Sequence, residues 1–136
     1  MEKYSRVFKA LSDKTRLRII NLLLRSDLEL CVCEIVDSLN EPQYNVSKHL
    51  KELKFAGLIE EKKMGRWMSY SLLPPQDKFK EFLLKAITSI PKDLTAKDEQ
   101  MLKARLFLRK GRQCIIGMQS KQWEVMLEEL KKERRI

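Results

Sequence analysis

The sequence predicts a mainly α-helical protein with one small β-hairpin, which places it in the α+β class. Apolar residues recur at intervals of three and four through most of the chain, as they do on one face of a helix. Met68, Tyr70 and Leu72 instead alternate with polar residues, as in a half-buried strand. A length of 136 residues suffices for one hydrophobic core, and no apolar run reaches membrane-spanning length. We therefore expect a cytoplasmic protein with no membrane partner.

The first two helices are expected before residue 27. One covers Tyr4–Leu11, whose apolar residues lie on a single face. Ser12 and Asp13 then form an N-cap pair, because their short polar side chains accept hydrogen bonds from the free N–H groups of a helix start. Leucine and isoleucine follow at helical spacing. The second helix is therefore expected between this cap and Ser26.

A second pair of helices is expected around a tight turn. The first of them begins at Cys31 or the next residue and ends at Leu39, and the turn that follows contains Pro42. Proline suits the first helical position because the N–H that it lacks would be unpaired there. The next helix is expected over Gln43–Ala56. Gly57 ends it, since glycine readily adopts the left-handed conformation found after helix ends.

A β-hairpin is expected directly after these helices. Ile59–Lys63 forms its first strand, Met64 and Gly65 form its turn, and the alternating segment up to Leu72 forms its second strand. A short helix, a turn, a helix and a hairpin make the outline of a winged helix-turn-helix. The hairpin would be the wing of that fold.

Three further helices are expected after the hairpin. Phe79–Ile90 carries an apolar stripe too rich for one small domain to bury, so this helix is expected to form a homodimer interface before Pro91 ends it. Helices over Leu94–Arg109 and Ser120–Arg134 should follow. The chain therefore divides into a winged helix-turn-helix DNA-binding core (1–73), a dimerisation helix (74–91) and a C-terminal extension (92–136).

The fourth helix and the hairpin carry the residues expected to bind DNA. A net charge of +9 favours a polyanionic partner. The apolar stripe of the fourth helix faces the core and leaves polar and basic side chains outward, and positive residues surround the hairpin tip. Ordinary solvated surface would look similar, but the helix-turn-helix context favours double-stranded DNA. The candidate contacts are Gln43, Tyr44, Asn45, Ser47, Lys48, Lys51, Lys62, Lys63 and Arg66.

Two thiols one residue apart precede the expected DNA-reading helix, in Cys31-Val32-Cys33. Residues i and i+2 of a regular helix point about 200° apart. Both thiols can therefore bind one ion only if Cys31 lies at or before the helix start, or if the first turn unwinds. A helix amino end favours the thiolate, which is the ligand form, and thiolates select soft ions. The same pattern would also fit two buried structural cysteines.

The remaining cysteine, Cys114, lies far along the chain between two glycines, which suggests a loop. Three cysteines cannot all pair in disulfides within one chain. Cys114 could complete a three-sulfur site with Cys31 and Cys33, or it could be a buried packing residue. The single histidine, His49, excludes a zinc site of several histidines and is expected to make a structural hydrogen bond.

Several short segments together carry a family resemblance. They are Ala10-Leu11-Ser12-Asp13, Thr15-Arg16-Leu17-Arg18-Ile19, Glu29-Leu30-Cys31-Val32-Cys33-Glu34-Ile35, Val46-Ser47-Lys48-His49-Leu50, Gly57-Leu58-Ile59 and Gly65-Arg66-Trp67. The chain resembles arsenic-responsive repressors of the ArsR/SmtB family over roughly residues 4–90. The resemblance implies a homodimeric repressor on an operator of a metal-resistance operon. It would need no cofactor and would leave DNA when arsenite, antimonite or another thiophilic metal binds.

The resemblance also assigns residues. The family's thiol ligands carry over to Cys31 and Cys33, and its recognition helix carries over to Gln43–Ala56. Arsenite-responsive members often have a third cysteine where this chain has Val36. A trigonal sulfur site must then take its third ligand from elsewhere, and Cys114 is the only cysteine left.

Two other functions fit part of the pattern. A repressor that senses oxidants through its thiols would use the same cysteines. A dithiol oxidoreductase fits less well, because Cys-X-Cys lacks the Cys-X-X-Cys spacing of that class and no acid–base constellation accompanies it. The chain is therefore expected not to be an enzyme and to have no catalytic residues.

Overall fold

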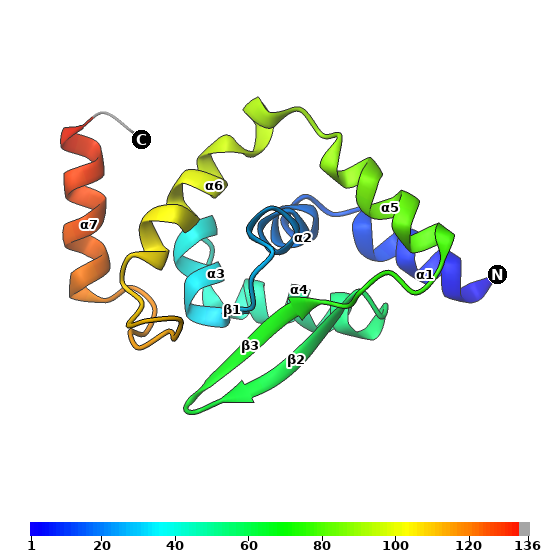
Figure 1. The fold of residues 1–136 in the computed structure, drawn as a ribbon, viewed down its shortest axis with the longest axis horizontal. Helices are drawn as coiled ribbons and strands as arrows, with labels where there is room; N and C mark the ends of the chain where they lie inside the picture. The colour runs from blue at the N-terminus through cyan, green and yellow to red at the C-terminus, as the bar shows by residue number, and fades with distance from the viewer. Residues whose placement is uncertain (134–136) are drawn as a thin grey trace.

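The computed structural model describes residues 1–133 and confirms the mainly α-helical class with a small β component. Figure 1 shows α5 and α6 arching over α2, with the hairpin on the opposite side and α7 at the edge far from the N-terminus. None of the helices within the described residues is both long and apolar enough to cross a membrane. The elements are α1 (Glu2–Leu11), α2 (Lys14–Ser26), β1 (Leu30–Cys31), α3 (Val32–Leu39), α4 (Gln43–Phe55), β2 (Ile59–Met64), β3 (Trp67–Leu72), α5 (Lys78–Thr88), α6 (Lys92–Leu106) and α7 (Lys121–Lys132).

The helix starts follow from local capping chemistry. The Asp13 carboxylate accepts a hydrogen bond from the Arg16 N–H at 3.0 Å, as expected of an N-cap. Ser120 caps α7 in the same way through the Trp123 N–H, at 3.1 Å. Pro42 is the N-cap of α4 and not its first helical residue, so that expectation was one position wrong.

The last two helices differ at their ends from the expected ranges. α6 begins at Lys92, directly after Pro91, and its last residue is Leu106. Arg109 therefore lies in the turn after α6 and not within the helix, because the chain tightens into three-residue hydrogen bonds from residue 107 onward. The expected end of the last helix, Arg134, lies outside the described residues.

The sheet has one strand more than expected. β1 pairs antiparallel with β3, and β3 pairs with β2, so the order is β1-β3-β2. Leu30 lies opposite Tyr70, and Cys31 lies opposite Ser69. A strand of two residues is too short to show an alternating pattern, which is why the sequence did not indicate it. The hairpin turn is Gly65-Arg66, one residue later than expected, because Met64 pairs with Trp67.

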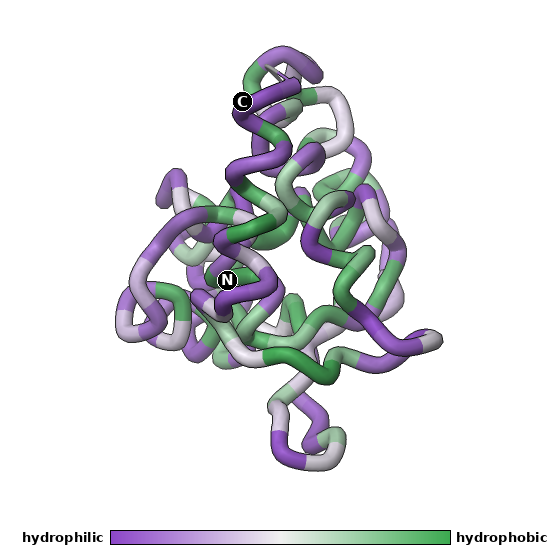
Figure 2. Tube along the Cα trace, turned by 90° about the vertical axis from the view of Figure 1, so that its left-hand side faces the viewer, coloured by the Kyte–Doolittle hydropathy of each residue, from purple (hydrophilic) through white to green (hydrophobic). Residues whose placement is uncertain are grey.

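The C-terminal helices pack on the rest of the molecule. Buried residues from α1 to α4 and the sheet form one core, to which Ile87 of α5 and Leu102 of α6 belong. A second cluster around Met101, Trp123 and Leu130 holds α7 against α6. Figure 2 shows α7 in front, with hydrophobic and hydrophilic turns alternating along it, as one apolar face requires. The extension after the hairpin is therefore built onto the core.

Aromatic side chains remain exposed on one surface of the molecule. Phe79 of α5 lies edge-on to Tyr4 and Phe8 of α1, with ring centroids 4.8 and 5.5 Å apart. Phe8 is 57% exposed and Phe82 is 58% exposed. These rings form an exposed aromatic surface of α1 and α5.

Candidate functional site

The helix-turn-helix comprises α3 and α4, and the hairpin β2–β3 lies beside it (Figure 1). Tyr44 is 79% exposed, and the amide of Asn45 donates to Glu41 at 3.3 Å. Every expected DNA contact is exposed except Asn45, which is half-buried. The structure thus presents these residues on α4 and the hairpin tip, and their contact with DNA stays a prediction.

His49 lies in the interface between α2 and α4 and makes the expected structural contacts. Arg16 donates to its Nδ1 at 3.0 Å, and its Nε2 is 3.8 Å from the Asp13 carboxylate. Burial lowers the pKa of His49 below its usual value, which keeps the ring neutral and able to accept from Arg16. The histidine therefore connects the second helix to the recognition helix.

The paired thiols lie at the start of α3. Cys31 ends β1 and is the N-cap of α3, with extended backbone angles, and Cys33 is the second residue of that helix. Both side chains are buried. Because Cys31 precedes the helix, the opposed directions expected of two helical residues do not apply. Cys31 thus lies before the helix start, as a shared ion would need, but the Cys33 sulfur does not belong to the group of ligand atoms within 4.8 Å of one another that the described residues form. Binding of one ion by both thiols stays a prediction.

Cys114 lies in the loop between α6 and α7 and is half-buried beside these thiols. Its sulfur, the sulfur of Cys31 and a carboxylate oxygen of Glu34 all lie within 4.8 Å of one another. The Cys114 thiol also lies 3.5 Å from the carbonyl oxygen of Ile116. The fold therefore brings the third cysteine to the paired thiols, as a three-sulfur site requires.

Hydrogen bonding among the thiols shifts their pKa values in opposite directions. Donation from Cys31 and then Cys33 lowers the pKa of Cys114, and the nearby Arg105 charge acts the same way. The pKa of Cys31 and that of Cys33 are both raised, chiefly by their hydrogen bonds to Cys114. The cluster thus favours a single thiolate, on Cys114, and a thiolate is the form that binds a soft ion.

Glu34 is a fully buried carboxylate that the sequence did not single out. One of its oxygens accepts from the Cys31 N–H at 3.0 Å and from Arg109 at 2.7 Å, and the other accepts from Arg109 at 2.5 Å. Arg109 also donates to the carbonyl of Glu29. Both Glu34 oxygens are therefore already engaged in hydrogen bonds.

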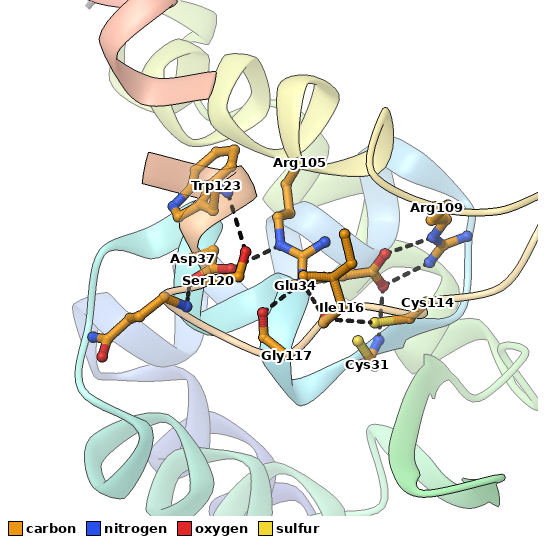
Figure 3. Close-up of polar contacts among 11 residues, drawn as sticks. Cys31, Glu34, Asp37, Arg105, Arg109, Cys114, Ile116, Gly117, Ser120 and Trp123 are labelled. Carbon is orange, nitrogen blue, oxygen red and sulfur yellow. Dashed lines mark hydrogen bonds and ion pairs between the residues drawn. The ribbon is translucent and has the colours of Figure 1, made fainter. Parts of the chain in front are cut away.

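A second buried ion pair joins α3 to α6 about one turn further along α3. The Arg105 Nε donates to Asp37 at 2.7 Å, and both side chains are almost completely buried. Arg105 also donates to the carbonyl of Ile116 at 2.7 Å, and the Gln119 N–H donates to the other Asp37 oxygen. Figure 3 shows these contacts joining α3, α6 and the Cys114 loop.

The two pairs form an ionic ladder between α3 and the end of α6. Glu34 and Asp37 are three residues apart and lie on one face of α3. Arg105 lies in the last turn of α6 and Arg109 in the turn that follows it, and both reach that face. The earlier acid pairs with the later arginine, so the two segments run antiparallel. This spacing was visible in the sequence, but nothing in it indicated that the two segments meet.

A groove gives access to the sulfur cluster. It has a volume of about 1110 Å³ and lies between the hairpin tip and the loop that follows α6. Cys31, Glu34 and Cys114 line it together with Arg66 of the hairpin. The candidate site therefore opens on the side of the molecule that carries the hairpin.

The helix-turn-helix with its hairpin defines a winged helix-turn-helix DNA-binding protein. Residues 13–61 match the family described as bacterial regulatory protein, arsR family. The chain is 42% identical over 86 residues to the uncharacterized HTH-type transcriptional regulator MJ1325 of Methanocaldococcus jannaschii, a match that covers 61% of this chain and 93% of that protein. The chain belongs to the arsR family. It is therefore a transcriptional regulator, which confirms the expectation that it is not an enzyme.

Several relatives whose names state a role match between about half and two thirds of the chain. It is 35% identical over 92 residues to the arsenic resistance transcriptional regulator ArsR1 of Pseudomonas putida, covering 68% of this chain and 71% of that one. It is 45% identical over 69 residues to the arsenical resistance operon repressor of Escherichia coli, covering 50% of this chain and 57% of the repressor. It is also 40% identical over 63 residues to the cadmium regulator CadC of Lactococcus lactis, covering 46% and 52%.

Solved structures show the same fold. Reduced HlyU from Vibrio cholerae superimposes with a TM-score of 0.55 at 30% identity, covering 65% of this chain and 92% of that chain. The homodimeric winged helix-turn-helix domain of Mb0332 from Mycobacterium bovis gives 0.54 at 26% identity, covering 64% and 76%. These matches confirm the winged helix-turn-helix class.

Proposed function

We propose that this protein is a metalloid-responsive repressor, released from operator DNA when arsenite or antimonite binds Cys31, Cys33 and Cys114. One observation carries the proposal: thiols from two distant segments converge at the start of α3, the helix that precedes the recognition helix. Three-coordinate arsenic takes three sulfurs, which replace the three hydroxyl groups of arsenous acid. The thiol protons leave with those groups as water. Soft thiolates select such ions.

The position of Cys31 supports a route from the ion to DNA. Cys31 belongs to both β1 and the start of α3, and it pairs with Ser69 on the hairpin strand β3. Drawing the sulfurs of Cys31 and Cys33 onto one ion requires the first turn of α3 to shift. That shift would act on α4 through the turn and on the hairpin through the strand pair, so both proposed DNA contacts would change together.

The proposal includes the homodimer and the division of the chain. Residues 1–73 would bind DNA, 74–91 would dimerise through the aromatic surface of α1 and α5, and 92–136 would supply the third thiol. The homodimeric Mb0332 domain and the exposed aromatic rings support the dimer. The operator would then be an imperfect palindrome, because two copies of α4 are related by a two-fold axis.

The decisive experiment is an effector panel on the complex of the protein with its own promoter. Arsenite and antimonite are expected to release the DNA at concentrations at which cadmium does not. If cadmium alone releases the DNA, the effector would be a divalent thiophilic metal and not a metalloid. Cadmium is the ion named for the CadC regulators among the relatives. Failure of the protein to prefer its promoter over unrelated duplex would contradict the repressor assignment itself.

A redox-sensing repressor is the second candidate, and the proximity of the Cys31 sulfur to the Cys114 sulfur favours it. Peroxide could oxidise these two thiols to a disulfide, with two electrons and two protons passing to the peroxide to give two waters. Peroxide in the same panel tests this reaction. Release by peroxide with no response to arsenite would select this candidate.

Recognition and phosphate contacts should be separable by substitution. Tyr44→Ala is expected to relax the preference for the promoter by about 1–3 kcal/mol, because its exposed side chain lies on the amino-terminal turn of α4. Lys48→Ala should instead weaken all duplexes alike and lower the salt slope by about one. Titrations of promoter and unrelated duplex at several salt concentrations check both results. Lys131→Ala, on exposed α7, is the control and should change neither.

The third sulfur can be counted directly. Wild-type protein with arsenite is expected to show three As–S bonds by X-ray absorption, and Cys114→Ser is expected to show two with an oxygen as the third ligand. Serine is chosen because it nearly preserves the size of the side chain. An unchanged sulfur count in Cys114→Ser would make this cysteine a packing residue.

A further inference from the structure

The turn Lys110–Gln113 is a well-defined projection between the ionic ladder and Cys114. The Lys110 N–H donates to the Gln113 carbonyl at 3.0 Å, and the Gln113 N–H donates back to Lys110 at 3.1 Å. Gly111 has a φ of +63°, which side chains other than glycine rarely adopt. The turn is therefore a tight loop with two residues at its tip.

Two cationic side chains on this turn have no polar partner among residues 1–133. Lys110 and Arg112 are exposed, and neither side chain makes a hydrogen bond or an ion pair within residues 1–133. The neighbouring Arg105 and Arg109 differ completely, since both are paired with carboxylates and hold the loop to α3. No acidic residue occurs from Lys103 to Arg112, so the turn presents uncompensated positive charge.

The hairpin tip lies across the groove from these cations. Lys63 and Arg66 of the tip and Arg112 of the turn line the same groove, whose lining also includes Glu29 and Glu34. Arg66 lies over the Trp67 ring, 5.7 Å from its centre, and the hairpin offers no carboxylate to this groove. Two neighbouring projections thus carry positive charge toward the same side of the molecule.

We propose that the turn Lys110–Gln113 contacts the DNA phosphate backbone beside the hairpin and thereby joins effector binding to DNA binding in one segment. The proposal rests on the operator-binding function proposed above. Phosphates of duplex DNA are closely spaced, and exposed Lys and Arg side chains bind them without reading sequence. An acidic partner protein fits less well, because the neighbouring hairpin already belongs to the face proposed to meet DNA.

The same turn is attached to the sulfur cluster at both ends. Arg109, which precedes it, binds Glu34 and the carbonyl of Glu29. Cys114, which follows it, lies within 4.8 Å of Cys31 and Glu34. Movement of Cys114 toward an ion must therefore displace the turn, since only Gln113 separates Arg112 from Cys114. Effector binding would loosen these phosphate contacts at the same time as those of α4.

Salt dependence of promoter binding tests the contact. The double variant Lys110→Ala/Arg112→Ala is expected to lower the slope of log affinity against log salt by about two, since each lost phosphate contact contributes about 0.9. Lys131→Ala/Lys132→Ala removes two exposed cations from the end of α7 in the same extension and should keep the wild-type slope. Arg112→Lys preserves the charge and should also keep it.

A wild-type slope in the Lys110→Ala/Arg112→Ala variant would overturn the proposal, and so would an affinity loss with no change of slope. Circular dichroism of each variant confirms that the helices remain folded, so a lost fold is not mistaken for a lost contact. The measurement is made without effector. The two proposals can therefore fail separately. If the slope changes in this variant but arsenite does not release the wild-type protein in the effector panel, the phosphate contact is supported and the metalloid response is contradicted.

Discussion

Cys31→Ser is expected to stay on its operator at arsenite concentrations that fully release the wild-type protein. Serine nearly preserves the size of the side chain but offers no thiolate to a soft ion. The Cys31 side chain takes part in the capping box of α3, and serine is a favoured N-cap residue that can accept the same Glu34 N–H, so folding and DNA affinity should be unchanged. Fluorescence anisotropy of a labelled operator, titrated with arsenite, measures the loss of release.

The neighbouring cysteine gives the matched comparison. Cys33→Ser removes a second proposed ligand and should also abolish release, whereas Val32→Thr adds a hydroxyl at a half-buried position between the two cysteines, removes no thiol and should leave release intact. Unaltered arsenite release from either cysteine variant would reject the assigned site. Loss of operator binding by Cys31→Ser before arsenite is added would show that the thiol serves the fold and not the effector.

Asp37→Ala is expected to destabilise the protein by about 3–5 kcal/mol, because it leaves the fully buried Arg105 guanidinium without its counter-charge. Urea denaturation followed by circular dichroism measures the loss. Asp98→Ala is the matched control, since it breaks another arginine–carboxylate pair of α6, with Arg18. The Arg18 side chain is 33% exposed and can be hydrated, so this loss should be smaller.

The pair of Asp37 with Arg105 is expected to matter more for the position of Cys114 than for the stability of the fold. Burial raises the pKa of Asp37 even though Gln119 and Arg105 both donate to it, so desolvation of this pair is costly. Replacing both partners by apolar residues, as Asp37→Leu/Arg105→Met, should therefore recover most of the lost stability. It cannot recover the hydrogen bonds of Arg105 to the carbonyls of Ile116 and Gly117.

The stable double variant separates the two roles of the ladder. Its arsenite complex is expected to contain two As–S bonds, as in Cys114→Ser, because the loop that carries the third thiol is no longer held to α3. X-ray absorption gives the count. Three As–S bonds in that variant would show that the loop reaches the site without Arg105, and the ladder would then be only a packing feature.

Much of the architecture follows from local patterns in the chain. The helices of the core repeat apolar residues at three- and four-residue spacing, and Asp13 and Ser120 cap helices because the capping hydrogen bond spans only three residues. The hairpin follows from alternation in the same local way. The sequence did not predict the two-residue strand β1, because β1 pairs with β3, whose residues lie far along the chain.

Half of the candidate site was determined by the sequence alone, and the other half only by the tertiary structure. Cys31 and Cys33 are two residues apart at a helix start, so the sequence alone identifies them as candidate ligands of one ion. Where Cys114 lies is decided by the buried pairing of Arg105 with Asp37 and Arg109 with Glu34. Spacing shows that Glu34 and Asp37 share a face of α3. Which faces meet depends on how the whole core packs, because ion pairs form only between helices that packing has already brought together.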